Sequence, residues 1–206
     1  MNDKVLFQGA GYTIIRTYKA ETLVPYFEAE REDGNMNYGW FDVRGRPEHV
    51  LDIPEARKNK GLANLLRVIA QPCSKLMSSA CECGLFDNGA SSTGKRWTAG
   101  GFVTGMFLDA QKNVESESLV ELARYILGGI EPTVDHHISY EMFIEPLKGF
   151  FGRLDCHALT IKPFGHGESE TLAWAAFEHA SNAVANSIQR GRPEADRITL
   201  LDDGNC

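Results

Sequence analysis

The sequence predicts an α+β domain with a mainly antiparallel sheet and about three helices, one of which is a long amphipathic C-terminal helix packed on the sheet. Three observations carry this prediction. Segments rich in β-branched and aromatic residues recur along the chain, with clean alternation over Ile138–Ile144. Apolar residues repeat at helical spacing over Leu62–Ile69 and again over Ser169–Arg190. Runs of strands with few helices between them favour an α+β fold, here a single domain over residues 1–192 with a polar tail at 193–206.

The first half of the chain is predicted to be extended up to residue 53 and helical after it. Turn signals such as Gly45-Arg46-Pro47 separate four extended segments. These segments are Tyr12–Tyr18, Val24–Arg31, Tyr38–Arg44 and His49–Ile53. A helix follows over Leu62–Ile69, and Pro72 must kink or break it because proline removes a backbone donor. Ser74–Cys83 is expected to continue as a second helical piece.

The second half alternates between strands and helices. The turn-rich residues 87–98 predict a long loop. Strands are then expected over Phe102–Leu108, Ile138–Ile144 and His157–Ile161, and a helix capped near Asn113 or Ser116 is expected to carry Leu119, Leu122 and Ile126. The final helix begins near Ser169, because Glu168 and Glu170 suit the positive end of its dipole, and ends at Arg190 before Gly191 and Pro193.

Composition sets broad limits on function. The chain has 206 residues, 21 basic and 28 acidic, for a net charge of −7. This balance disfavours direct nucleic-acid binding, which depends on basic residues. The sequence shows no apolar run of the roughly 20 residues that a membrane helix needs and no signal-peptide pattern at its start, so we expect a cytoplasmic protein. The five cysteines then predict free thiols, and their spacing predicts no structural metal site.

The leading functional hypothesis is an acidic, non-catalytic interaction protein that binds a protein partner with a basic surface. No set of reactive residues has the spacing and context of a known catalytic motif, although this leaves open whether the chain is an enzyme. Aromatic residues concentrate binding energy at interfaces, and Trp40, Phe150 and Phe151 are the predicted partner-binding residues. The class is that of an inhibitor or adaptor, for example a phage-encoded inhibitor of a nucleic-acid-binding complex, without a cofactor. Trp174 and Phe177 flank the apolar stripe of the last helix, which allows a homodimer.

The first alternative is a CoA-dependent N-acyltransferase. A glycine-containing turn that opens a helix presents free backbone N–H groups to an anion, and Lys58 and Lys60 add positive charge. The stretch Pro54–Leu66 is similar to the pyrophosphate-binding motif of the GCN5-related N-acetyltransferases, with Gly61 and Ala63 at its small positions and Lys58 in place of its arginine. This resemblance implies acetyl-CoA as the cofactor, held by backbone amides near these four residues.

The second alternative is a metal-dependent hydrolase that uses the C-terminal histidines. The candidate ligands are Asp135, His136, His137, Glu141 and His157, because divalent-metal sites combine imidazole and carboxylate ligands. Adjacent strand residues point to opposite faces, so only one of His136 and His137 can join His157. The stretch His137-Ile-Ser-Tyr also resembles one half of the two-histidine phosphoesterase signature.

Overall fold

The protein is an α+β molecule built on one six-stranded sheet. The computed structural model describes residues 3–190 except 21, 31–33, 35, 90–94 and 131–136. The sheet has the order β1-β2-β8-β10-β7-β6. Its strands are β1 (Lys4–Gly9), β2 (Tyr12–Arg16), β6 (Leu76–Asp87), β7 (Trp97–Phe107), β8 (Ile138–Pro146) and β10 (His157–Gly167). The predicted tail at 193–206 lies outside the described residues.

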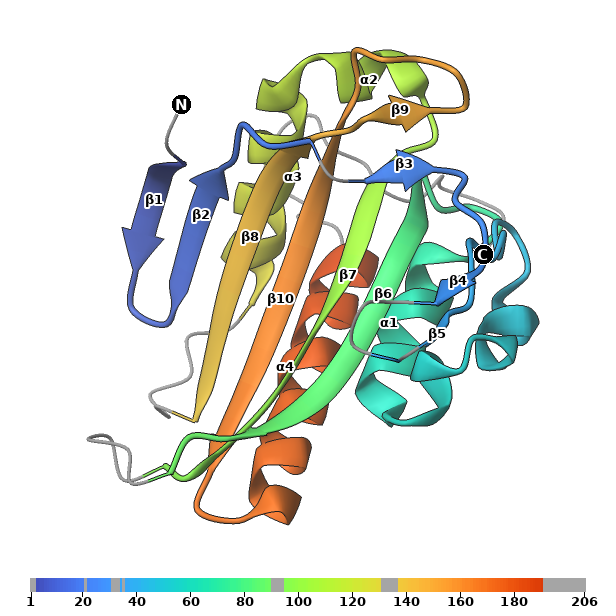
Figure 1. Ribbon diagram of the computed structural model, residues 1–206. Coiled ribbons are helices and arrows are strands. Elements are labelled where there is room, and N and C mark those ends of the chain that lie inside the picture. The colour runs from blue at the N-terminus through green and yellow to red at the C-terminus, as the bar shows by residue number, and fades with distance from the viewer. Residues whose placement is uncertain are drawn as a thin grey trace.

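Helices cover one face of this sheet, and short strands lie over part of the other face (Figure 1). The helices are α1 (Lys60–Ile69), α2 (Ala110–Val114), α3 (Ser116–Gly129) and α4 (Glu170–Arg190), with two 3-10 helices, η1 (Pro47–Asp52) and η2 (Glu55–Arg57). Two small sheets pair β3 (Leu23–Val24) with β9 (Gly149–Phe150) and β4 (Ala29–Glu30) with β5 (Met36–Asn37). No described helix is long and apolar enough to cross a membrane.

The expected α+β class is confirmed, and the structure refines two details of the prediction. The sheet is mainly antiparallel but not purely so, because β2 pairs with β8 in parallel while the other neighbouring strands of the sheet pair antiparallel. The described helices also exceed the three expected, since residues 47–57 form 3-10 turns and a short helix precedes α3.

Two similar units make up the centre of the sheet. The hairpin β6–β7 is followed by α2 and α3, and the hairpin β8–β10 is followed by α4. The second strands of the two hairpins, β7 and β10, pair antiparallel at the centre. The first strands, β6 and β8, therefore occupy equivalent outer positions. The outer edge of β8 pairs with β2, whereas the outer edge of β6 pairs with no other strand of this sheet, because β6 is its last strand.

The C-terminal helix α4 packs very closely on β10. A Cβ atom added at Gly165 would lie 2.1 Å from the Phe177 nitrogen and 2.5 Å from the Ala173 carbonyl oxygen. Only glycine leaves room for the helix backbone at this distance. Phe177, Ala180 and other small or apolar residues of α4 are consequently buried in the main core. The long helix predicted over Ser169–Arg190 is thus present and packed on the sheet.

Four elements of the first half differ from the sequence prediction. Tyr38–Arg44 is not a strand, because none of its residues joins a described sheet. Ser74–Cys83 is not helical, because residues from Leu76 onward pair with β7, and a bulge between Ser78 and Ala80 interrupts the alternation that would have identified a strand. His49–Ile53 is not a strand: Pro47 starts the 3-10 helix η1 at this point. The strand β1 was not expected.

The described part of residues 22–53, here called the arm, crosses the sheet face opposite the helices. At one end of that face, β3 and β9 cover a second, smaller core. Val24 and Phe150 pack there against Met77, Met106 and neighbouring apolar residues. From β3 the arm continues along the β6 side of the sheet to η1 (Figure 1).

Candidate functional site

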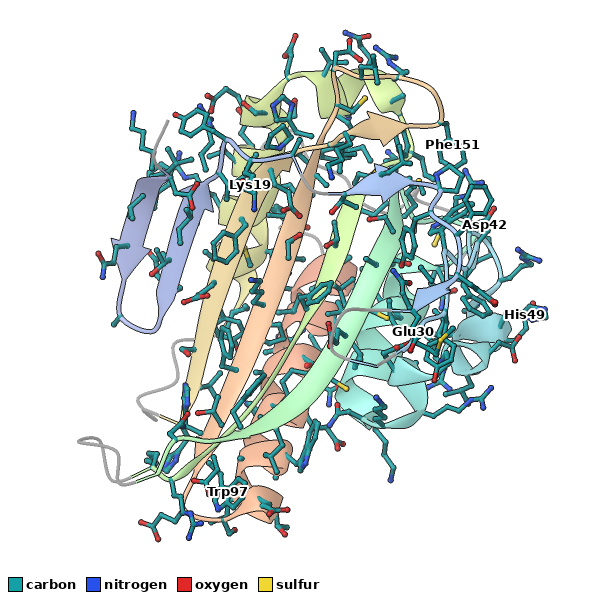
Figure 2. All side chains as sticks on the ribbon, viewed as in Figure 1. Lys19, Glu30, Asp42, His49, Trp97 and Phe151 are labelled. Carbon is teal, nitrogen blue, oxygen red and sulfur yellow. The ribbon has the colours of Figure 1, made fainter. Side chains whose placement is uncertain are left out.

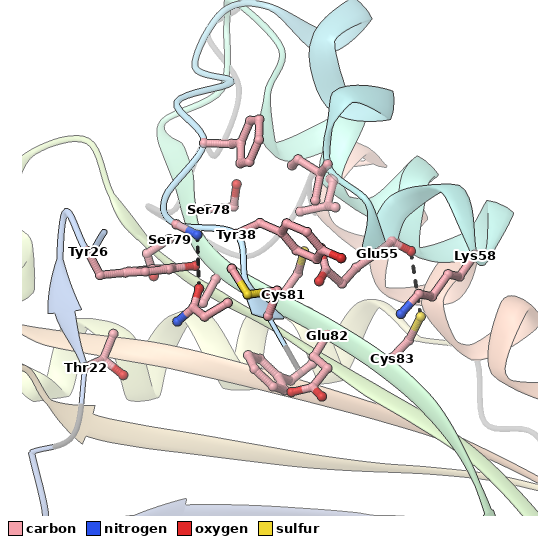
Figure 3. A pocket seen from close by; sticks show the side chains of 18 of the residues that line it. Thr22, Tyr26, Tyr38, Glu55, Lys58, Ser78, Ser79, Cys81, Glu82 and Cys83 are labelled. Carbon is pink, nitrogen blue, oxygen red and sulfur yellow. Dashed lines mark hydrogen bonds between the residues drawn. The ribbon is translucent and has the colours of Figure 1, made fainter. Parts of the chain in front are cut away.

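A groove of about 620 Å³ lies between the arm and strand β6 (Figure 3). This volume is within the range of ordinary ligand sites. One wall consists of Ser78–Cys83 on β6 and Phe102 on β7, and the opposite wall belongs to the arm. The arm and the helical base contribute Thr22, Leu23, Tyr26, Met36, Asn37, Tyr38, Gly39, Phe41, Ile53, Glu55, Lys58 and Leu66. We call this site the β6 groove.

The β6 groove follows the edge of the strand. Six consecutive residues, Ser78–Cys83, line it. Successive strand side chains point to opposite faces of a sheet: here Cys81 pairs with the buried Val103 on the helix side, whereas Glu82 pairs with Phe102 on the other side. A cavity that contacts all six residues must run along the strand edge, because it meets side chains of both faces. Ala80, Cys81 and Glu82 are partly exposed there, whereas Ser78, Ser79 and Cys83 are buried.

Trp40 connects the arm to this edge. Its backbone N–H donates to the Tyr26 carbonyl at 3.0 Å, and its indole Nε1–H donates to the Ser78 carbonyl at 3.3 Å. Gly39 precedes it with φ +79°, and an added Cβ would lie 3.2 Å from the Glu28 nitrogen, so a larger residue would strain this turn. The arm is therefore held at a fixed position beside β6, so the groove between them is part of the folded structure.

The base of the groove carries opposite charges from one short segment. Glu55 begins η2, and Lys58 follows that turn, so both side chains reach toward β6 (Figure 3). The Glu55 carbonyl accepts hydrogen bonds from the Lys58 N–H at 3.1 Å and from the Cys83 thiol at 3.8 Å. Asn59 then caps α1 by accepting from the Leu62 N–H at 3.0 Å.

The electrostatic environment of the groove disfavours anions. Burial raises the pKa of Tyr26 to about 12 and that of the Cys81 thiol to about 12, and the Glu55 carboxylate contributes to both shifts. Burial, together with Glu55 and against the opposing effect of Lys58, raises the pKa of Cys83 to about 11. These thiols are therefore protonated at neutral pH and are poor nucleophiles. Both are free cysteines, as the sequence predicted. The same prediction is wrong for Cys73, which is disulfide-bonded.

The three predicted partner-binding aromatics lie together at the β3–β9 end of the arm. Phe151 is exposed (Figure 2). Its ring packs edge-on against Trp40, with ring centres 5.3 Å apart, and against Phe150, with ring centres 5.0 Å apart. The Arg44 guanidinium lies 5.5 Å from the Phe151 ring centre and also binds Asp42 in a bidentate arrangement. Phe150 is only 5% exposed, so its expected place on the surface is wrong: it is part of the smaller core, and Trp40 is half-buried.

The proposed acetyl-CoA residues are arranged differently from an open anion site. Gly61 packs against α4, where an added Cβ would lie 2.5 Å from the Glu178 carbonyl oxygen, and Ala63 is buried. The helix α1 follows 3-10 turns instead of a strand, although Lys60 is exposed at its start. Lys58 alone of the four lines the β6 groove. Acetyl-CoA binding remains a prediction that this geometry does not favour.

The histidines predicted as metal ligands are separated along the sheet. His157 pairs with Pro146, whereas Gly165 pairs with Ile138, next to His137. Eight residues of strand separate these positions, about 26 Å, so His137 and His157 cannot bind one ion. Asp135 and His136 lie outside the described residues, and the part of the chain that is described contains no group of three metal-binding side chains.

Comparisons with known proteins leave this geometry as the basis for function: no family model, curated protein or solved structure matches the chain. Sequence reasoning missed most of the β6 groove, including Tyr26, Glu55 and Cys81. The available signal was the run of small residues from Ser78 to Cys81, whose side chains leave space beside a strand.

Proposed function

We propose that this protein is a protein-binding module that takes an extended segment of its partner into the β6 groove by strand addition. The observation that carries the proposal is the lining of one groove by six consecutive residues of an edge strand. Every second residue of an edge strand turns its N–H and C=O away from its single neighbour. Peptides that add to such an edge gain affinity from main-chain hydrogen bonds and specificity from pockets for alternate side chains.

Contacts already present in the groove support this mode of binding. The Ser78 carbonyl accepts the Trp40 indole N–H, so a backbone acceptor of β6 is directed toward the arm and already bonds a donor from it. Tyr26 and Tyr38 supply aromatic surface on the facing wall. Aromatic side chains bury a large area at little entropic cost, which suits them to anchor a peptide.

Charge favours a partner segment that carries a basic side chain. The Glu55 carboxylate lies in a partly desolvated site whose surroundings keep Tyr26, Cys81 and Cys83 protonated. A cation entering this site would be attracted by Glu55 and by the net charge of −7. Lys58 at the rim would repel a second basic residue there, which restricts the register of the bound segment.

The test begins with a displayed library of random peptides about eight residues long, the length of an ordinary strand. We expect enrichment of extended sequences with one Lys or Arg at a fixed position. Glu55→Lys should weaken the selected peptides at least about tenfold, whereas Glu121→Lys, an equal charge change at an exposed position on α3, should leave binding unchanged. Far-UV circular dichroism of both variants establishes that they are folded.

N-methylation of each peptide amide in turn tests the strand geometry. Because only alternate residues of an added strand face β6, methylation should abolish binding at every second amide and leave the others nearly unaffected. Failure to enrich any peptide, or a methylation profile without this period of two, would refute strand addition.

A further inference from the structure

A second group of polar side chains lies on the face of the sheet opposite the helices, at the far end from β9. Thr98 on β7 pairs directly with His166 on β10, and Ser139 on β8 pairs with Phe164, two residues earlier. The side chains share this face because the neighbouring Gly165 is directed against α4. Thr98, Ser139 and His166 are half-buried, so each keeps part of its surface exposed.

Each nitrogen of the His166 ring has a hydroxyl group as its neighbour. Ser139 Oγ lies 3.0 Å from Nε2, and Thr98 Oγ1 lies 3.0 Å from Nδ1. Thr98 Oγ1 also accepts a hydrogen bond from Asn88 Nδ2 at 2.7 Å. In the tautomer with a proton on Nδ1, the ring donates to Thr98 and the Ser139 hydroxyl donates to Nε2. The Phe164 ring lies nearly parallel to the imidazole, with ring centres 6.5 Å apart.

The surroundings keep this imidazole neutral. Burial lowers the pKa of His166, and the positive charge of Lys95 lowers it further. The Lys95 ammonium lies 2.8 Å from Nε2 of His137, whose carbonyl accepts the His166 backbone N–H at 2.7 Å. A neutral imidazole in contact with a hydroxyl is the arrangement that a general base needs to activate a serine.

We infer that Ser139 is a nucleophile activated by His166 and that this site cleaves carboxylic esters by acyl transfer. Ser139 Oγ attacks the ester carbonyl carbon while its proton passes to His166 Nε2. The bond from carbon to the alcohol oxygen then breaks, and the alcohol leaves with that proton. Water, deprotonated by the same nitrogen, releases the acid and restores the serine. Thr98 is a positioning residue that selects the tautomer.

The probe for this inference is a fluorophosphonate, which serine attacks at phosphorus with loss of fluoride. Intact-mass spectrometry should show one phosphonyl group per chain, mapped to Ser139, on the native protein and none after heat denaturation. Ser139→Ala should abolish labelling, and Ser118→Ala, a matched change on α3, should label at the wild-type rate. His166→Gln should slow labelling about 100-fold.

Thr98→Asp separates catalysis from a purely structural role. A carboxylate at Nδ1 would raise the pKa of His166, so the pH at which labelling reaches half its maximum should move upward. A structural hydrogen bond would produce no such shift in the profile. Two results would overturn the inference: absence of labelling on folded wild-type protein beside a labelled reference esterase, and undiminished labelling of Ser139→Ala. If Ser139→Ala does not fold, an unmoved pH profile in Thr98→Asp overturns it equally.

Discussion

Replacing Gly165 by alanine tests the close packing of α4 against the sheet. The new Cβ would lie 2.1 Å from the Phe177 nitrogen and 2.5 Å from the Ala173 carbonyl oxygen. Both are backbone atoms, so no side-chain rotation can relieve the contact, and the helix must move away by about 1 Å to reach normal separation. Overpacking of this kind costs about 3 kcal/mol of unfolding free energy, which lowers Tm by about 6–12 °C in a domain of this size.

Gly105→Ala is the matched control on β7. There an added Cβ would meet its nearest neighbour, the Met77 carbonyl oxygen, at 3.4 Å, an ordinary contact. Alanine restricts the unfolded chain more than glycine does, so this variant should gain about 0.5 kcal/mol. Urea unfolding followed by circular dichroism measures both free energies. If Gly165→Ala remains within about 1 kcal/mol of wild type, the packing described here is wrong.

Three further predictions concern the arm and the groove. Trp40→Phe removes the indole donor to the Ser78 carbonyl and should cost about 1 kcal/mol in chemical unfolding; unchanged stability would show that this bond does not hold the arm. At pH 8, iodoacetamide should alkylate Cys81 and Cys83 at least about 100-fold more slowly in native than in denatured protein, because the pKa values of both thiols are raised. Equal alkylation rates in native and denatured protein would contradict the burial of these thiols. The Arg44 guanidinium lowers the pKa of Asp42, so the ion pair contributes to stability above the unfolded pKa of about 3.9, and this contribution is lost as pH falls through the lowered pKa. Asp42→Asn should therefore make Tm depend less on pH in the acid range. An unaltered dependence would argue against the Asp42–Arg44 pair.

Local sequence patterns identified much of the secondary structure because they report burial on one face. Alternation located β8, and helical spacing located α1, α3 and α4. The sequence predicts Ser74–Cys83 as a second helical piece after Pro72, and the strand there is hard to recognise because a bulge shifts its alternation by one residue at Ser79. The parallel pairing of β2 with β8 joins residues more than 120 positions apart, and no local pattern encodes such a contact.

The candidate sites were harder to predict than the elements that carry them. Lys58 was singled out for its charge and does line the β6 groove, but its neighbours Tyr26, Glu55 and Cys81 come from three separate segments. Their convergence depends on how the arm crosses the sheet. The contact of Ser139 with His166 likewise depends on the register between β8 and β10, which the sequence leaves open.

The internal symmetry of the sheet predicts how a peptide would lie on β6. The two hairpin units place β8 and β6 at equivalent outer positions, and the chain's own strand β2 is added to β8 in parallel. The same relation applied to β6 predicts a peptide that runs parallel to it. A spin label at the peptide N-terminus should therefore broaden the amide signals near Leu76 and leave those near Asp87 sharp. Broadening near Asp87 instead of Leu76 would mean that the peptide runs antiparallel to β6. The pairing of β2 with β8 would then not predict how a peptide binds in the β6 groove.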